Sequence, residues 1–178
     1  IVGTMPLFVV LPIKKYVDAL YNNTWFIAIA LLCTGCLLFI SDRLARGKKT
    51  ERTTTIPDVV IIGFAQALAT IPGLSRSGTT ISMGMMRGCK RDFAVRYSFL
   101  LSIPAVIGAN ILSLVDAVRA GIDWSLFPAY LLGVVVAAVS GYFAIRLVNV
   151  LANKGKFGSF AYYCWGVGIL ALILSAVL

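Results

Sequence analysis

The chain has 178 residues, of which 60% are hydrophobic and 13% are charged, and its mean hydropathy is +0.92. A soluble domain carries about twice that share of charged residues, so the composition predicts an integral membrane protein. The formal net charge is +9, but the basic residues lie in short connections between apolar runs, as they do in membrane proteins whose positive loops face the cytoplasm. We therefore expect the bilayer, and no nucleic acid, as a partner.

The first 13 residues are mostly apolar and lead to Lys14 and Lys15. This run is too short to cross about 30 Å of hydrocarbon at about 1.5 Å per residue. Because the chain begins with Ile1, we expect residues 1–13 to be the end of a helix that starts upstream. Four later apolar runs are long enough to span the membrane, and they cover residues 25–40, 97–118, 125–145 and 157–178.

Two cysteines in the first of these runs, Cys33 and Cys36, have the C-x-x-C spacing of redox and zinc sites. Inside a spanning helix we interpret them as two buried thiols on one face. The chain has no histidine, and Cys89 and Cys164 supply no second pair at ligand spacing. We therefore favour a packing role for these thiols.

Two basic connections flank the apolar segment 56–86, and their positive side chains are Arg43, Arg46, Lys48, Lys49 and Arg52 before it and Arg87, Lys90, Arg91 and Arg96 after it. Both connections should be cytoplasmic, so the segment between them must return to the side that it left. Pro72, Gly73 and Gly78 interrupt its helical pattern. The sequence therefore predicts a re-entrant helix-loop-helix over about residues 56–86.

The interruption reads PGLSRSGTT, residues 72–80. Non-helical backbone at membrane depth is stable only where protein or a watery cavity surrounds it, so this segment predicts a pocket. The second half-helix would point its N–H groups at the loop and favour an anion, Arg76 adds a fork suited to phosphate, and glycines let the backbone come close. The predicted phosphate-binding residues are Gly73, Ser75, Arg76, Ser77, Gly78 and Thr80.

Among these residues Arg76, Ser75 and Thr80 are the candidates for a catalytic role. Gln66, ten residues before Arg76, could orient a phosphate or a partner residue, although helix packing is an equally good explanation. Gly73 to Thr80 also fits the outline of a nucleotide P-loop, but Thr79 stands where lysine is required and no strand precedes the motif. A purely structural alternative has Arg76 at the membrane interface, or paired with Asp58 or Asp92.

The stretch AQALATIPGLSRSGTTISMGMMRG, followed by YSFLLSIPAV at residues 97–106, resembles the second signature region of the undecaprenyl-diphosphate phosphatases, the bacitracin-resistance family. Its P-G-x-S-R-S-x-x-T pattern is complete, and the similarity of spacing and hydropathy covers essentially the whole chain. The resemblance implies a multi-pass enzyme of the bacterial inner (plasma) membrane that converts undecaprenyl diphosphate to undecaprenyl phosphate. This reaction recycles the lipid carrier of cell-wall synthesis, and bacitracin resistance is a consequence.

The resemblance also implies dependence on a divalent cation, Mg²⁺ or Ca²⁺, whose ligands this chain does not identify, and it leaves a homodimer open. It implies an inverted repeat, in which residues 1–40 end the first half, 41–55 form a basic cytoplasmic loop and 56–178 form the second half. The family's first signature, a glutamate-rich re-entrant segment ending in Ser/Thr-Gly-His, has no counterpart here. We therefore expect about 90 to 100 residues of the family pattern to be missing, together with its acid-base groups.

The alternative function is an inverted-repeat transporter or translocator of an anionic lipid or phosphate, because broken helices aimed at an anion also build transporter sites. Phosphate release from a lipid diphosphate would distinguish the two. A polyprenyl chain further requires a groove open to lipid. Met83, Met85 and Met86 are candidates for its wall, and ordinary core packing is the alternative for each of them.

Overall fold

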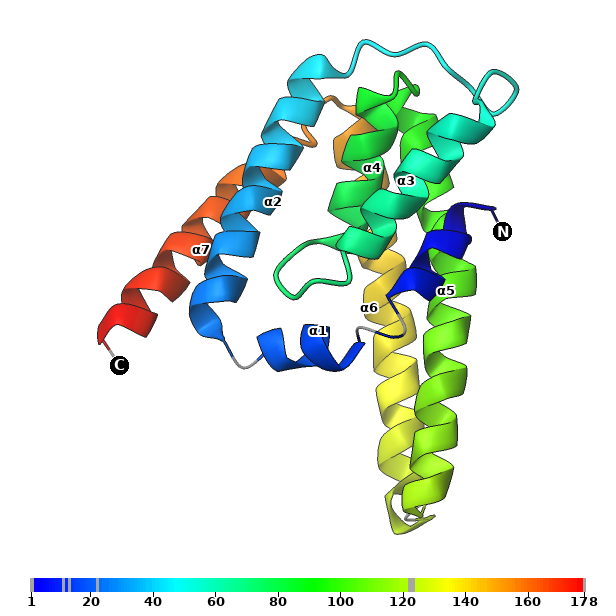
Figure 1. Cartoon of the computed structure of the whole chain (residues 1–178), viewed down its shortest axis with the longest axis vertical. Helices are drawn as coiled ribbons and strands as arrows, with labels where there is room; N and C mark the ends of the chain where they lie inside the picture. The colour runs from blue at the N-terminus through cyan, green and yellow to red at the C-terminus, as the bar shows by residue number, and fades with distance from the viewer. Residues whose placement is uncertain (1, 11, 13, 22, 122–123, 178) are drawn as a thin grey trace.

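The computed structural model describes residues 2–10, 12, 14–21, 23–121 and 124–177. These residues form helices joined by loops, and they contain no strand longer than an isolated bridge. Four helices are long and apolar enough to cross a membrane, namely α2 (Thr24–Leu44), α5 (Arg91–Ala120), α6 (Phe127–Asn153) and α7 (Ser159–Val177). They correspond to the four predicted spans. The protein is therefore an all-α polytopic membrane protein (Figure 1).

The beginning of the chain differs from the prediction of one helix that ends near Lys14. Val2–Val9 form a 3-10 helix, η1. A separate helix, α1 (Lys14–Leu20), begins where the predicted helix should end. Pro6 lies inside η1 and Pro12 stands just before α1. Each proline lacks the N–H that an α-helix needs and constrains the residue before it, so a continuous α-helix over this region was a wrong expectation.

α3 (Ile56–Leu68) and α4 (Arg76–Met86) form a helical hairpin. A capping box begins α3, in which Thr55 and Asp58 satisfy each other's backbone N–H groups. The start of α3 and the end of α4 lie at one end of the molecule, and the loop that joins the helices lies toward the other end (Figure 1). This is the shape that a re-entrant segment requires, and its placement in the membrane stays a prediction.

The two basic connections meet at the open end of this hairpin. The backbone N–H of Lys49 donates to the carbonyl oxygen of Gly88 at 2.9 Å, and the N–H of Lys90 donates to the carbonyl oxygen of Lys49 at 2.9 Å. This short bridge joins segments about 40 residues apart in sequence. The connections therefore lie at the same end of the protein, as the charge pattern predicted, and most of the basic residues gather there.

The remaining helices flank the hairpin in two pairs (Figure 1). α7 lies along α2. The two helices approach closely at Gly35, where an added Cβ would come within 2.5 Å of the Trp165 ring. α5 and α6 form a long antiparallel pair whose apolar side chains are largely exposed and so are available to lipid. The buried core lies where α2, α4 and α7 meet the start of α5 and the end of α6, and it contains Leu38, Ile81, Met85, Cys89, Ala94, Val95, Ala152, Phe157, Ala161 and Cys164.

The C-x-x-C thiols are not in this core, which corrects their interpretation as buried. Thr34 and Gly35 occupy the buried face of α2, and consecutive residues of a helix point about 100° apart, so Cys33 and Cys36 turn outward and are exposed. Both thiols are free. The two thiols are part of an apolar surface of α2 that lipid can cover.

Candidate active site

The PGLSRSGTT segment forms the loop and the first turn at the tip of the α3–α4 hairpin. Ser75 caps α4, because its side-chain oxygen accepts a hydrogen bond from the N–H of Gly78 at 3.1 Å. The N–H groups of Arg76 and Ser77 have no acceptor among the described residues. A helix N-terminus with open N–H groups favours an anion, so the predicted half-helix and its polarity are present.

A threonine of α2 fixes the shape of this loop. The Thr34 hydroxyl lies 3.0 Å from the carbonyl oxygen of Ala30 and 3.2 Å from that of Gly73, either of which can accept its proton, and it accepts a hydrogen bond from the N–H of Ser75 at 3.3 Å. Gly73 has a φ of +90°, and a Cβ there would come within 2.6 Å of the carbonyl oxygen of Ile27. Only glycine therefore lets the loop approach α2 so closely. Sequence reasoning missed Thr34, whose only signal was a lone hydroxyl in an apolar helix.

Arg76 is half-buried, and its guanidinium makes no hydrogen bond or ion pair with any described residue. The two carboxylates proposed as structural partners are occupied elsewhere, since Asp58 binds Lys49 and Arg87, and Asp92 binds Arg96. The pairing alternative is therefore absent from this structure. The guanidinium is available for a ligand.

Arg76 borders a polar cleft of about 390 Å³ between α3, α4, α5 and α6. The cleft brings together four residues singled out from the sequence with two serines of α5 that were not, and its lining is Gln66, Arg76, Ser77, Thr80, Ser98, Phe99, Ser102 and Ile145. Ser98 and Ser102 were detectable as a hydroxyl pair at i, i+4 spacing, which places both on one helix face. No acidic side chain lines the cleft, so its electrostatics favour an anion.

Thr80 is 2% exposed, and its hydroxyl contacts the carbonyl oxygens of Arg76 at 2.9 Å and Ser77 at 3.2 Å, and the hydroxyl of Ser98. A threonine has one O–H to donate. If that proton goes to the backbone, Ser98 is the donor in the Thr80–Ser98 contact. Thr80 therefore joins α4 to α5 and positions the wall of the cleft. Direct contact of Thr80 with a phosphate stays a prediction.

Two more clefts adjoin the motif, and both are mainly apolar. One of about 530 Å³ lies among the hairpin loop, η1, α1 and α5, and Arg76 borders it as well. The other, of about 250 Å³, is called the apolar slot here and lies among α2, α4, α6 and α7. Its lining begins with Ser75, Ser77 and Gly78 and continues through Leu31, Leu38, Ile81, Val148, Phe157, Phe160, Tyr163 and Cys164.

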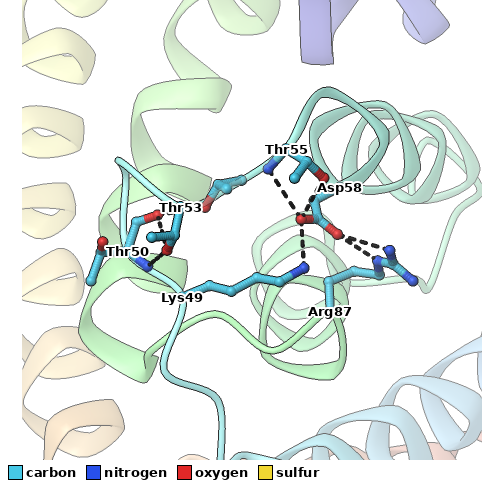
Figure 2. Close-up of polar contacts among 7 residues, drawn as sticks. Lys49, Thr50, Thr53, Thr55, Asp58 and Arg87 are labelled. Carbon is cyan, nitrogen blue, oxygen red and sulfur yellow. Dashed lines mark hydrogen bonds and ion pairs between the residues drawn. The ribbon is translucent and has the colours of Figure 1, made fainter.

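The base of the hairpin holds a second polar cluster, built around Asp58 (Figure 2). The buried carboxylate accepts from Lys49 Nζ at 2.7 Å and from Arg87 Nε at 2.9 Å, and the N–H of Thr55 donates to it at 3.2 Å. These bonds, that of Lys49 first, hold the pKa of Asp58 well below its usual range although burial raises it. The cluster joins the basic loop, the start of α3 and the end of α4.

The side chains at the tip are not those that a divalent cation needs. Mg²⁺ and Ca²⁺ bind carboxylate and carbonyl oxygens, whereas the polar cleft offers a guanidinium, an amide and hydroxyls. In the described part of the chain no three His, Cys, Asp or Glu residues lie together as metal ligands would. These residues alone do not fit a divalent cation, so no chemical step is derived through one.

Fold and site together define a class, a polytopic helical membrane protein whose helix hairpin carries at its tip an open helix N-terminus and an arginine that is unpaired among the described residues. The family model for bacitracin resistance protein BacA matches residues 1–170, and the chain belongs to this family. A protein named undecaprenyl-diphosphatase from Halothermothrix orenii is 38% identical over 178 residues, which cover 99% of this chain and 69% of that protein. The expected family is thereby confirmed.

Two other relatives carry the same name. The protein from Methanosphaera stadtmanae is 38% identical, and the alignment covers 100% of this chain and 64% of that relative. The protein from Methanothermobacter thermautotrophicus is 40% identical over 181 residues, which cover 99% of both chains. The chain thus spans about two thirds of the length of some relatives and nearly the whole length of another.

Proposed function

We propose that this protein removes the terminal phosphate of undecaprenyl diphosphate and leaves undecaprenyl phosphate, which returns to cell-wall synthesis as lipid carrier. Membership of the BacA family and the activity that its relatives are named for support this function. The observation that carries it is Arg76, which borders a polar cleft beside the open N-terminus of α4 without a partner among the described residues. Bacitracin resistance would follow from more rapid recycling of the carrier.

The residues at the tip provide charge stabilisation and positioning, which make up the larger part of phosphoryl-transfer catalysis. In the reaction a water oxygen bonds to the terminal phosphorus, and the bond from that phosphorus to the bridging oxygen breaks. The bridging oxygen leaves with the lipid monophosphate, and the proton lost by water goes to solvent or a base. Arg76 and the N–H groups of Arg76 and Ser77 would balance the negative charge that accumulates on the phosphate oxygens.

The apolar clefts beside the motif suit the hydrocarbon part of this substrate. Both adjoin residues of the motif, so a phosphate held at the tip would have apolar surface next to it. No methionine is among the described residues that line these two clefts. Met85 is 1% exposed and belongs to the core, whereas Met86 is 44% exposed, so a role for Met83 or Met86 beside the lipid stays a prediction. For Met85, ordinary packing describes the structure better, and the lining of the described clefts is aliphatic and aromatic.

Three further expectations extend this proposal. The protein would lie in the cytoplasmic (inner) membrane, with the basic end on the cytoplasmic side. A divalent cation would take part in the reaction, with carboxylate ligands that are not among the residues of the polar cleft. A homodimer is a further proposal that oligomer measurements in detergent would test. No observation in the described part of the chain favours transport over hydrolysis.

The test is phosphate release from undecaprenyl diphosphate by the purified protein in detergent. Arg76→Lys keeps the charge but loses the planar fork, and it should lower the rate about 100- to 1000-fold. Arg96→Lys is the matched control, because Arg96 is an exposed residue paired with Asp92 within α5, and it should stay within about twofold. Near-normal phosphate release by a folded Arg76→Lys protein would contradict the phosphate site.

A further inference from the structure

The polar cleft contains a buried amide that the phosphate motif does not use. Gln66 lies on α3, its side chain is 1% exposed, and its Nε2 atom has no hydrogen-bond partner among the described residues. A buried donor without an acceptor is costly, and native structures rarely tolerate one. Because Gln66 lines the cleft, the missing acceptor is best supplied by whatever occupies that cleft.

The neighbouring groups show what kind of ligand would fit. Ser98 and Ser102 line the same cleft from α5, but each hydroxyl has a single proton, and these protons are engaged, that of Ser98 with the Thr80 hydroxyl and that of Ser102 with the carbonyl oxygen of Phe99 at 2.7 Å. Among the described residues, the amide of Gln66 is therefore the free neutral side-chain donor of this wall. The only charged residue of the lining is Arg76. Donors around a single cation, with no carboxylate, favour an anion rich in acceptor oxygens.

The cleft has two sets of donors on different helices. One set is the N-terminus of α4 with Arg76, and the other is the amide of Gln66 on α3. A volume of about 390 Å³ is in the usual range for a small-ligand site. A diphosphate has two groups of acceptor oxygens, whereas a monophosphate has only one.

We propose that the amide of Gln66 forms a second anion subsite that holds one phosphate of a diphosphate while Arg76 and the α4 N-terminus hold the other. The proposal rests on the proposed function and deepens it. A diphosphate engages both subsites, and the monophosphate product engages one. The second subsite therefore makes the protein select diphosphates and release the monophosphate.

The experiment compares inorganic pyrophosphate with inorganic phosphate as inhibitors of the whole protein, with undecaprenyl monophosphate measured as the product by chromatography. Gln66→Leu removes the amide donors at similar size. Loss of one hydrogen bond to a charged group corresponds to about a 10- to 100-fold weakening, which is expected for pyrophosphate, while inhibition by phosphate should change less than about threefold. Phe64→Leu, on the exposed side of the same helix, is the matched control and should change neither.

The ratio of the two inhibition constants is decisive, because a purely structural role of Gln66 would not move it. An unchanged ratio in folded Gln66→Leu, or equal weakening of both inhibitors, would overturn the second subsite. If thermal melting shows that Gln66→Leu does not fold, Gln66→Glu keeps the size and polarity, and its negative charge should again weaken pyrophosphate more than phosphate. An unchanged ratio in Gln66→Glu would overturn the proposal equally.

Failure of the subsite can be distinguished from failure of the proposed function. If Arg76→Lys loses phosphate release and the Gln66 variants keep the normal ratio, the phosphatase proposal stands and the subsite is removed. If the protein releases no phosphate at all, calorimetric binding of pyrophosphate and phosphate to the purified wild type and Gln66→Leu gives the same ratio without turnover. A lower pyrophosphate preference in Gln66→Leu would then still support the subsite.

Discussion

The two ends of the α3–α4 hairpin use charge in opposite ways. At the base, the buried carboxylate of Asp58 is matched by Lys49 and Arg87 and by the N–H of Thr55 (Figure 2). At the tip, Arg76 has no partner among the described residues. Paired charge fixes the place where three segments meet, whereas an unpaired, half-buried guanidinium in a membrane protein is an expected feature of a functional site. The difference suggests that the base is built for position and the tip for a ligand.

The largest effects are expected when one arginine is removed from each end of the hairpin, which tests directly whether base and tip have different roles. Arg76→Ala should lower phosphate release about 1000-fold and leave the melting temperature nearly unchanged, because no described contact is lost. Arg87→Ala should do the reverse, with a lower melting temperature and a rate within about tenfold, since it removes a partner of a buried carboxylate. Activity and thermal melting are measured on the same preparations. Equal loss of rate in both folded variants would show that the two ends are not functionally distinct.

The next effect in size concerns Asp58 itself. Asp58→Asn keeps the shape but removes the charge, and it should lower the free energy of unfolding by about 1 to 3 kcal/mol, since Lys49 and Arg87 are each partly exposed. The pKa of Asp58 is depressed in the folded protein, so its contribution is complete at neutral pH.

The pH dependence supplies the check on this assignment. The contribution of Asp58 should begin to disappear as pH falls below the ordinary carboxyl value of 3.8 toward the lower folded value. Wild type should therefore lose more stability on acidification than Asp58→Asn. Parallel unfolding curves for the two proteins between neutral and acid pH would contradict the ion-pair role.

A smaller effect is expected at the support of the tip. Thr34→Val removes the hydroxyl that contacts the loop at Gly73 and Ser75, and it should lower the rate about 10- to 30-fold with a modest loss of stability, since the N–H of Ser75 loses its acceptor. Ser140→Ala is the control, because that hydroxyl bonds only within exposed α6. A normal rate in Thr34→Val would show that the loop keeps its shape without α2.

The spans and the hairpin could be predicted because their signals are local. Twenty or so apolar residues between basic loops describe a spanning helix without knowledge of its neighbours. Pro72 and Gly73 marked the break in the hairpin, and the φ of +90° at Gly73 shows why glycine stands there. The open N-terminus of α4 followed from the same reasoning. The 3-10 helix at the start of the chain did not, because prolines only exclude the α-helix and do not select its replacement.

The parts of the site that were missed come from other helices. Thr34 and Ser98 each look like one hydroxyl in an apolar run, and only the packing of α2 and α5 against α4 shows that they support the motif. A lone buried hydroxyl in a membrane helix is a common packing residue, so sequence alone could not rank these above their neighbours. Gln66 was recognised but left undecided, and its unpartnered amide is a fact of tertiary structure.

The smallest expected effect concerns the apolar slot beside the tip, and it tests whether this slot holds the lipid part of the substrate. Val148 of α6 lines the apolar slot that starts at Ser75 and Ser77. If this slot holds the first part of the polyprenyl chain, Val148→Phe fills it and strains the complex by an amount comparable to overpacking a core, about 1 to 3 kcal/mol at most.

We expect Val148→Phe to lower kcat/KM about three- to tenfold for undecaprenyl diphosphate and to change it little for farnesyl diphosphate, whose short chain needs less of the slot. Val134→Phe, on the exposed face of the same helix, should alter neither substrate. An equal loss with both substrates in Val148→Phe would mean that the substitution disturbs the phosphate site through the packing of α4, and the slot would then have no role in holding the lipid.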